Sequence, residues 1–265
     1  MPHHTLAREE AIEVRAFLDL FHSAPRTMVD HDQLAFASIG DGCVVSLPFA
    51  PAIGLNRVLG LTDVNDLDRA LKWFTGRAGA RHVQINRSGA TREVLQWISD
   101  RELRQLDGSW TKLSREAPAS PIQWSSPVEV RLAGISEAKL FGELMCLGFG
   151  FPPKLAPFWS SPVGKQGWSC HVAYWNDIPV GTATMYVADG YAWLGGGTTL
   201  PEYRSRGVQG ALICDRLNVG AGLGVDVFAV ETVEPAPGKN RTSYDNLLRW
   251  GFRPLYTREN FLITR

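Results

Sequence analysis

Hydrophobic and polar positions alternate along this chain in a way that predicts helices and strands in turn. In the first half, apolar residues recur at helical spacing, which predicts amphipathic helices at 8–21, 66–75 and 91–99. Short apolar runs predict strands at 34–39, 43–47, 57–61, 82–85 and 110–113. Asp41-Gly42 is a hairpin turn signal between the first pair of these strands. This mixture of elements is typical of an α/β protein.

The second half repeats the same kind of order after a break. Its predicted strands lie at 128–132, 170–175, 180–187, 191–200, 225–231 and 260–265. Its predicted helices lie at 136–147 with Ser136 as the cap, at 212–221 and at 240–252, and 148–168 is predicted to be a long loop. Residues 116–127 are rich in proline and serine without a period, which predicts a linker. The recurring order predicts a weak internal repeat and two domains, 1–115 and 128–265.

Composition narrows the class of partner and the compartment. Lys plus Arg and Asp plus Glu both number 27 in 265 residues, so no charge excess points to nucleic acid or to a membrane. The four cysteines form no C-x-x-C pair and each lies in an apolar run, which predicts buried free thiols in a reducing setting. The first residues lack an apolar signal core. We therefore expect a cytoplasmic protein with no nucleic-acid or membrane partner.

Positive charge gathers at one predicted helix start. Pro201 closes the strand 191–200, and Arg204, Arg206 and Gly207 follow just before the next helix. The first turn of a helix carries unpaired N–H groups and a partial positive charge, and glycine lets a ligand approach the bare backbone. This stretch therefore predicts a site for a phosphate or a pyrophosphate.

The run Arg204-x-x-Gly207-x-Gln209-Gly210-Ala211 resembles the coenzyme A loop of the GNAT superfamily of N-acetyltransferases. The family pattern is Arg or Gln, two residues, Gly, one residue, then Gly or Ala, so Gln209 departs from its last position. The ending Gly251-Phe252 also fits the family, but Leu247 stands where the family often has a tyrosine that protonates the leaving thiolate. The resemblance is specific over the last third of the chain.

The fold that this resemblance implies has two GNAT-like domains in tandem, each a mixed, mostly antiparallel sheet flanked by helices. The first domain lacks the coenzyme loop, and the acidic run 65–68 stands at the corresponding helix start. These carboxylates would repel a phosphate, so only the second domain is expected to bind coenzyme.

The resemblance also implies acetyl-CoA as co-substrate, held in a gap between strands 191–200 and 225–231. Pantetheine would pair with the main chain, and a backbone N–H near Leu200 would polarise the thioester carbonyl. The coenzyme-binding residues expected on this basis are Thr198, Thr199, Leu200, Arg204, Arg206, Gly207, Val208, Gln209, Gly210, Ala211, Ser243 and Asn246. For Ser243 and Asn246, a position as ordinary polar residues on a helix explains the sequence equally well.

Two side chains are candidates for proton transfer. Glu231 ends a mostly apolar strand beside the gap, which suggests a general base; an ordinary carboxylate at a strand end is the alternative. Tyr244 lies three residues before Leu247 and is the candidate acid; an aromatic packed on the domain surface is the alternative. The spacing of the histidines and cysteines shows no metal-ligand pattern, so no metal is expected.

The acceptor is expected to be a small-molecule or peptide amine. The aromatic residues of the 148–168 loop, which lies where the family forms its acceptor pocket, suggest an apolar acceptor, or else they only pin the loop to the core; they are Phe149, Phe151, Phe158, Trp159 and Trp168. The expected function is acetyl-CoA-dependent N-acetyl transfer by direct attack. A catalytically weak acyl-CoA sensor or interaction module, and a site for another phosphate-bearing ligand, stay open as alternatives.

Overall fold

The computed structural model describes residues 6–31, 33–236, 238 and 240–263. Its first half contains α1 (Arg8–Ser23), α2 (Arg26–Asp30), β1 (Ala35–Ile39), β2 (Gly42–Ser46), β3 (Asn56–Leu59), α3 (Val64–Phe74), β4 (His82–Asn86), α4 (Arg92–Asp100), β5 (Arg104–Gln105) and β6 (Trp110–Glu116). Its second half contains β7 (Val128–Leu132), α5 (Ala138–Phe149), α6 (Ala156–Ser160), β8 (Trp168–Trp175), β9 (Ile178–Ala188), β10 (Tyr191–Thr199), α7 (Val208–Gly222), β11 (Val227–Val233), α8 (Thr242–Arg249) and β12 (Arg253–Leu262). The end of the last predicted strand, 264–265, lies outside the described residues.

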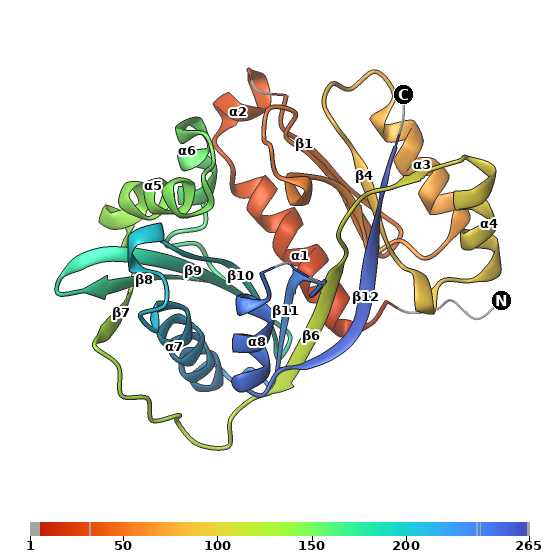
Figure 1. Ribbon diagram of the computed structural model, residues 1–265. Helices are drawn as coiled ribbons and strands as arrows, with labels where there is room; N and C mark the ends of the chain where they lie inside the picture. Colours follow the sequence, from red (N-terminus) through yellow and green to blue (C-terminus); the bar gives the residue numbers. More distant parts are fainter. Residues whose placement is uncertain (1–5, 32, 237, 239, 264–265) are drawn as a thin grey trace.

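The strands form one continuous sheet across both halves of the chain (Figure 1). Its order is β1-β2-β3-β4-β12-β6-β11-β10-β9-β8-β7, with the short β5 paired to β12. Most neighbours are antiparallel, and the parallel pairs are β3 with β4 and β10 with β11. The predicted mixed, mostly antiparallel arrangement flanked by helices is confirmed.

The last strand of each half is exchanged with the other half. β6, which ends the first half, pairs with β11, while β12, which ends the chain, pairs with β4. β6 and β12 also pair with each other and lie side by side at the centre of the molecule (Figure 1). The sequence pattern did not predict this exchange. The exchanged strands join the two halves through main-chain hydrogen bonds.

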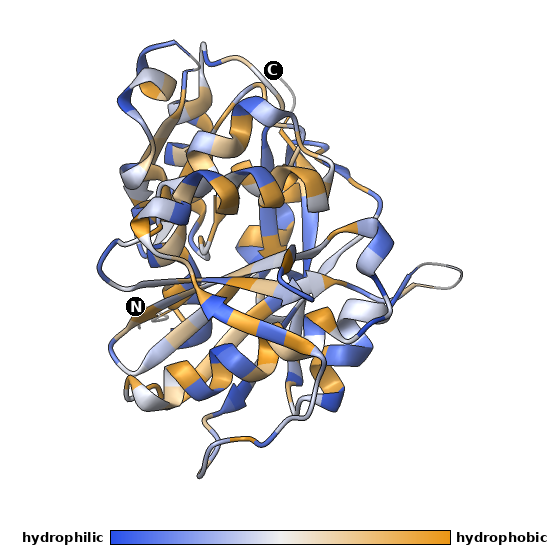
Figure 2. Ribbon diagram, turned by 90° about the vertical axis from the view of Figure 1, so that its left-hand side faces the viewer, coloured by the Kyte–Doolittle hydropathy of each residue, from blue (hydrophilic) through white to orange (hydrophobic). Residues whose placement is uncertain are grey.

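Helices cover both faces of the sheet, and their hydrophobic positions alternate with hydrophilic ones (Figure 2). On one face α1 packs on β1, β2, β10 and β11, so that one helix spans both halves. Phe17, Phe21, Phe158 and Trp193 belong to the apolar core on this face. On the other face, α3 and α4 cover the first half, and α7 and α8 cover the second.

Most predicted elements agree with the structure, but β12 begins at Arg253, seven residues before the predicted strand, α2 and β5 were not predicted, and further details differ. Ser136 does not cap α5, because a short 3-10 turn at Ile135–Glu137 precedes this helix. The predicted 148–168 loop contains α6, and β6 extends to Glu116. The first hairpin turns at Gly40 and Asp41, one residue earlier than expected. All four cysteines are free and buried, as predicted. Within the described part of the chain, no helix has the length and apolar character needed to cross a membrane.

Six charged side chains, which we call the seam cluster, are buried where the two halves meet. They are the acids Glu10, Glu13 and Glu231 and the bases Arg57, Lys112 and Arg258. Arg258 contacts all three acids, at 2.7 Å from Glu10 and 3.0 Å from Glu13, and Lys112 bonds to Glu13. The members come from α1, β3, β6, β11 and β12, and equal numbers of opposite charges compensate one another.

Burial and charge oppose each other within the seam cluster. Burial alone would raise the pKa of Glu13, but the charges of Arg258, Lys112 and Arg57 hold that pKa well below its usual range. The same balance lowers the pKa of Glu10. For Glu231, burial outweighs the attraction of Arg57 and Arg258, and the pKa is raised.

Candidate functional site

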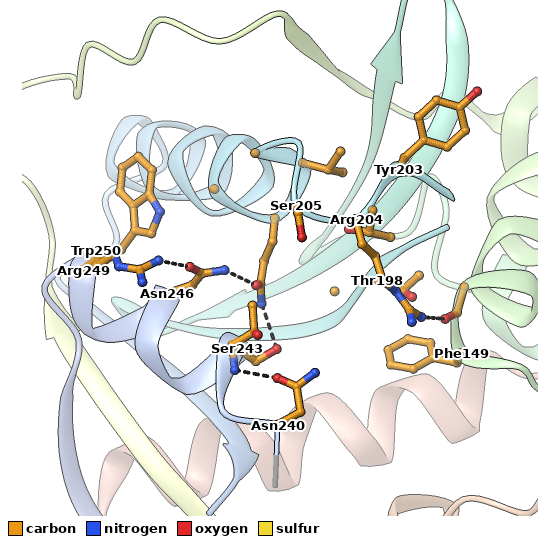
Figure 3. A pocket seen from close by; sticks show the side chains of 18 of the residues that line it. Phe149, Thr198, Tyr203, Arg204, Ser205, Asn240, Ser243, Asn246, Arg249 and Trp250 are labelled. Carbon is orange, nitrogen blue, oxygen red and sulfur yellow. Dashed lines mark hydrogen bonds between the residues drawn. The ribbon is translucent and has the colours of Figure 1, made fainter. Parts of the chain in front are cut away.

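A cavity of about 860 Å³ opens where β10 ends and where α7 and α8 begin (Figure 3). Its wall includes Thr198 and Thr199 at the end of β10, Gly207 at the start of α7, and Ser243 and Asn246 on α8. One strand end and two helix starts thus meet with their polar groups at one opening. The cavity volume is within the range of sites that bind a cofactor.

The loop before α7 has the backbone of an anion site. Gly207 takes φ +82°, in the left-handed region that glycine adopts without strain, and Ser205 before it also has a positive φ of 63°. Among the described residues no side chain caps α7, so the N–H groups of its first turn have no side-chain acceptor there. Because Gly207 and the residues after it line the cavity, these donors lie at its wall. The partial positive charge of the helix start favours a negatively charged ligand there.

The two parallel strands beside the cavity pair over only the first part of their length and then separate. Tyr191 to Leu194 of β10 pair with Val227 to Val230 of β11, and the pairing ends there. The register of β10 against β9 shifts between Gly195 and Thr198, as at a β-bulge. β11 continues to Val233 beside β6. The predicted opening between these strands is therefore present, and the cavity lies at its β10 side.

A chain of polar side chains connects α7 to α8 across the cavity wall (Figure 3). Gln209 Nε2 donates to Ser243 Oγ at 3.1 Å, and Asn246 Nδ2 donates to Gln209 Oε1 at 2.6 Å. Arg249 Nη1 donates to Asn246 Oδ1 at 2.7 Å. Gln209, the residue that departs from the family pattern, thereby ties the two helix starts together.

Comparison with known proteins decides the fold. No protein-family model matches the chain, and no curated protein sequence matches it closely. A solved structure of a GCN5-related N-acetyltransferase from Kribbella flavida matches 97% of this chain and 96% of its own, with a TM-score of 0.64 at 14% identity. A tandem GNAT protein from the clavulanic acid biosynthesis pathway matches 94% of both chains with a TM-score of 0.56 at 15% identity. The chain has the GNAT fold.

A further structure with this fold is a GCN5-related N-acetyltransferase from Sphaerobacter thermophilus. It matches 75% of this chain and 66% of its own, with a TM-score of 0.59 at 17% identity. Within the GNAT fold of this chain, nine of the twelve residues predicted to bind coenzyme line the cavity; they are Thr198, Thr199, Arg204, Gly207, Val208, Gln209, Gly210, Ser243 and Asn246. The structure therefore brings most of the predicted set together.

The other three predicted residues lie outside the cavity wall. Leu200 packs against the core beneath α5, and its N–H already donates to Val180 O at 2.8 Å. The N–H of Leu200 itself is thus paired with β9, and the expectation that a backbone N–H near Leu200 polarises the thioester carbonyl stays a prediction. Arg206 lies over the rings of Trp175 and Tyr203, and Ala211, a residue of α7, is buried in an apolar core.

The candidate base and acid differ in their surroundings. Glu231 is the first residue of β11 beyond the pairing with β10, but its carboxylate bonds to Arg57 at 3.1 Å and to Arg258. Tyr244 is half-buried against the apolar core under α8 and is not part of the cavity wall. Leu247, at the position of the family's tyrosine, is buried in the same core. Both proton-transfer roles stay predictions.

Sequence reasoning missed two tryptophans of the cavity. Trp124 comes from the predicted linker and lies 5.0 Å from Trp250, centroid to centroid, and both line the cavity. Half of Trp124 is exposed, which is unusual for so large an apolar side chain. A lone tryptophan in a proline-rich linker was the signal that could have found this pair.

The aromatic loop 148–168 is divided between two environments. Phe149 lines the cavity and stacks on Phe151, which in turn stacks on Trp159. Phe158 and Trp168 are buried in the core beside α1. The residues of this loop therefore both pin it to the first half and reach the cavity. Among the described residues, no group of three or more His, Cys, Asp or Glu side chains could hold a metal ion.

Proposed function

We propose that the chain binds acetyl-CoA in this cavity and transfers the acetyl group to an amine. The observation that carries the proposal is the uncapped start of α7 behind a left-handed Gly207, beside strands that part. The diphosphate sits on the N–H groups of the α7 start, and the pantetheine enters between β10 and β11. The GCN5-related N-acetyltransferases of the same fold support this assignment.

The remaining parts of the cavity suit the rest of the coenzyme. The Trp124–Trp250 pair offers an aromatic face to the adenine, and Arg204 and Arg249 offer positive charge to phosphates. The first half lacks this arrangement, because Asp63 caps α3 by accepting hydrogen bonds from the N–H groups of Asn65 and Asp66. We therefore assign coenzyme binding to the second of two GNAT-like units, 128–265, joined to 1–115 by the 116–127 linker.

In direct transfer, the neutral amine attacks the thioester carbonyl carbon and the thiolate leaves, so no covalent enzyme intermediate is needed. Glu231 is the candidate base, and the raised pKa of its buried carboxyl suits a group that accepts a proton. A Glu231→Gln variant whose kcat/KM follows pH as the wild type does would exclude that role. The acceptor is a small-molecule or peptide amine, and the free cysteines fit a reducing compartment.

Calorimetry with CoA and a thiol-release assay with acetyl-CoA over a panel of amines test the function together. We expect binding in the micromolar range and amine-dependent release of CoA. Binding without release for any amine would favour the alternative, an acyl-CoA sensor or interaction module, which the buried Leu247 in place of a tyrosine supports. Displacement of CoA by ordinary nucleotides at equal affinity would instead indicate a different phosphate-bearing ligand.

A further inference from the structure

A buried arginine of α7 lies beside the point where β10 bulges. Arg216 is only 5% exposed, and no carboxylate of a described residue lies within ion-pair distance of it. Its Nε donates to Leu212 O at 3.0 Å, and its Nη1 donates to Thr184 O at 3.0 Å and to Gly195 O at 3.3 Å. A buried charge without a direct ion-pair partner is costly, and Asp215 offsets this cost only in part, since the pKa of Arg216 is still lowered.

The remaining nitrogen of Arg216, Nη2, lies next to Gly197, a residue of the cavity wall. Nη2 has no hydrogen-bond partner among the described residues, and it lies 3.8 Å from where a Cβ on Gly197 would stand. Gly197 lines the cavity and carries no side chain to screen this nitrogen. Burial lowers the pKa of the Arg216 guanidinium to about 10, so the group stays positively charged at neutral pH.

This position matters because the chain lacks the usual residue for the leaving group. Leu247 stands where the GNAT superfamily often has a tyrosine. The Leu247 side chain is buried in the apolar core. Tyr244 packs against the same core and does not line the cavity. A cation near the sulfur would stabilise the negative charge that develops there when the C–S bond breaks.

We propose that the Arg216 guanidinium stabilises the CoA thiolate as it leaves, taking the place of a proton-donating tyrosine. The proposal rests on acetyl-CoA binding in the cavity. The amine nitrogen forms a bond to the carbonyl carbon, the C–S bond breaks with its electron pair moving to sulfur, and the proton of the amine passes to a base or to water. Arg216 keeps its own proton throughout and acts by charge, and the thiolate takes a proton from solvent after release.

The pKa of the bound CoA thiol, followed by the ultraviolet absorbance of its thiolate as pH is raised, tests this role without any acceptor. In the wild type we expect a thiol pKa about one unit below that of free CoA, because a nearby cation favours the thiolate. Arg216→Met should return the thiol pKa to the free value, and Arg216→Lys should keep part of the shift. Amine-dependent kcat should fall about 10- to 100-fold in Arg216→Met.

Two further variants separate charge from structure. Gly197→Ala keeps Arg216 and adds a methyl group in ordinary contact at 3.8 Å, so it should fold even if Arg216→Met does not, and it should raise the thiol pKa. Lys139→Met removes an exposed cation of α5 that does not line the cavity and should leave the thiol pKa unchanged. If CoA binds to both the wild type and Gly197→Ala with the same thiol pKa, the role of Arg216 is overturned, while the proposed CoA binding stands. Failure of the wild type to bind CoA would overturn the proposed function and this role together.

Discussion

Replacing Gly207 with valine is expected to weaken CoA binding about 100-fold, or about 2.7 kcal/mol. Gly207 takes φ +82°, where a β-branched residue is strongly disfavoured. The loop must therefore rearrange, and the N–H groups of the α7 start no longer point together at a diphosphate. The new side chain would also occupy open space in the cavity, since the nearest atom to its Cβ position is Ser126 Oγ at 4.0 Å. Calorimetry with CoA measures the effect.

The matched control for this substitution lies at the far end of α7, the helix that Gly207 precedes. Gly222 ends α7, has an ordinary negative φ and has no atom within 4 Å of its Cβ position. Gly222→Val should therefore leave the CoA affinity unchanged, although it introduces the same valine side chain at the opposite end of α7. Equal CoA affinities for Gly207→Val and the wild type would show that the ligand does not use this loop.

Replacing Arg258 with methionine is expected to lower the free energy of unfolding by about 3 to 5 kcal/mol, because it leaves buried carboxylates without compensation. Arg258 is 1% exposed and contacts Glu10, Glu13 and Glu231 at once. For a chain of this size, the loss corresponds to a fall in Tm of roughly 10 °C. Urea unfolding followed by circular dichroism measures it, and Arg258→Lys, which keeps the charge, should lose less.

The pH dependence of this loss has a definite sign. The folded pKa values of Glu10 and Glu13 lie below their usual range, so their stabilising contribution is present above that range and is lost as pH falls through the folded values. The difference between wild type and Arg258→Met should therefore shrink as the pH is lowered below about 4. The exposed pair Arg26–Asp30 gives the control, since Arg26→Met should change stability little at either pH. A loss under about 1 kcal/mol at neutral pH for Arg258→Met would contradict the compensated seam cluster.

Local sequence signals predicted the elements and much of the cavity, because both depend on residues close together in the chain. The period of apolar residues located α1, α3 and α4. The run around Gly207 predicted the helix start because glycine, charge and a following helix lie within a few residues.

The features that sequence missed depend on contacts between distant segments. The exchange of β6 and β12 follows from which strand edges meet, and neither strand carries a local mark of its partner. By residue type, Glu13 and Lys112 would be expected at the surface. Both are buried because α1 packs against the sheet. The hydrogen bond from Leu200 N–H to Val180 O likewise depends on the pairing of β9 with the end of β10, which no local pattern shows.

A crystal structure of the protein with CoA bound tests the central claim most directly. We expect one CoA per chain, with its diphosphate oxygens on the main-chain N–H groups that follow Gly207 and its pantetheine between the ends of β10 and β11. CoA bound instead at the start of α3 in the first half, or an empty α7 start at saturating CoA, would contradict the account.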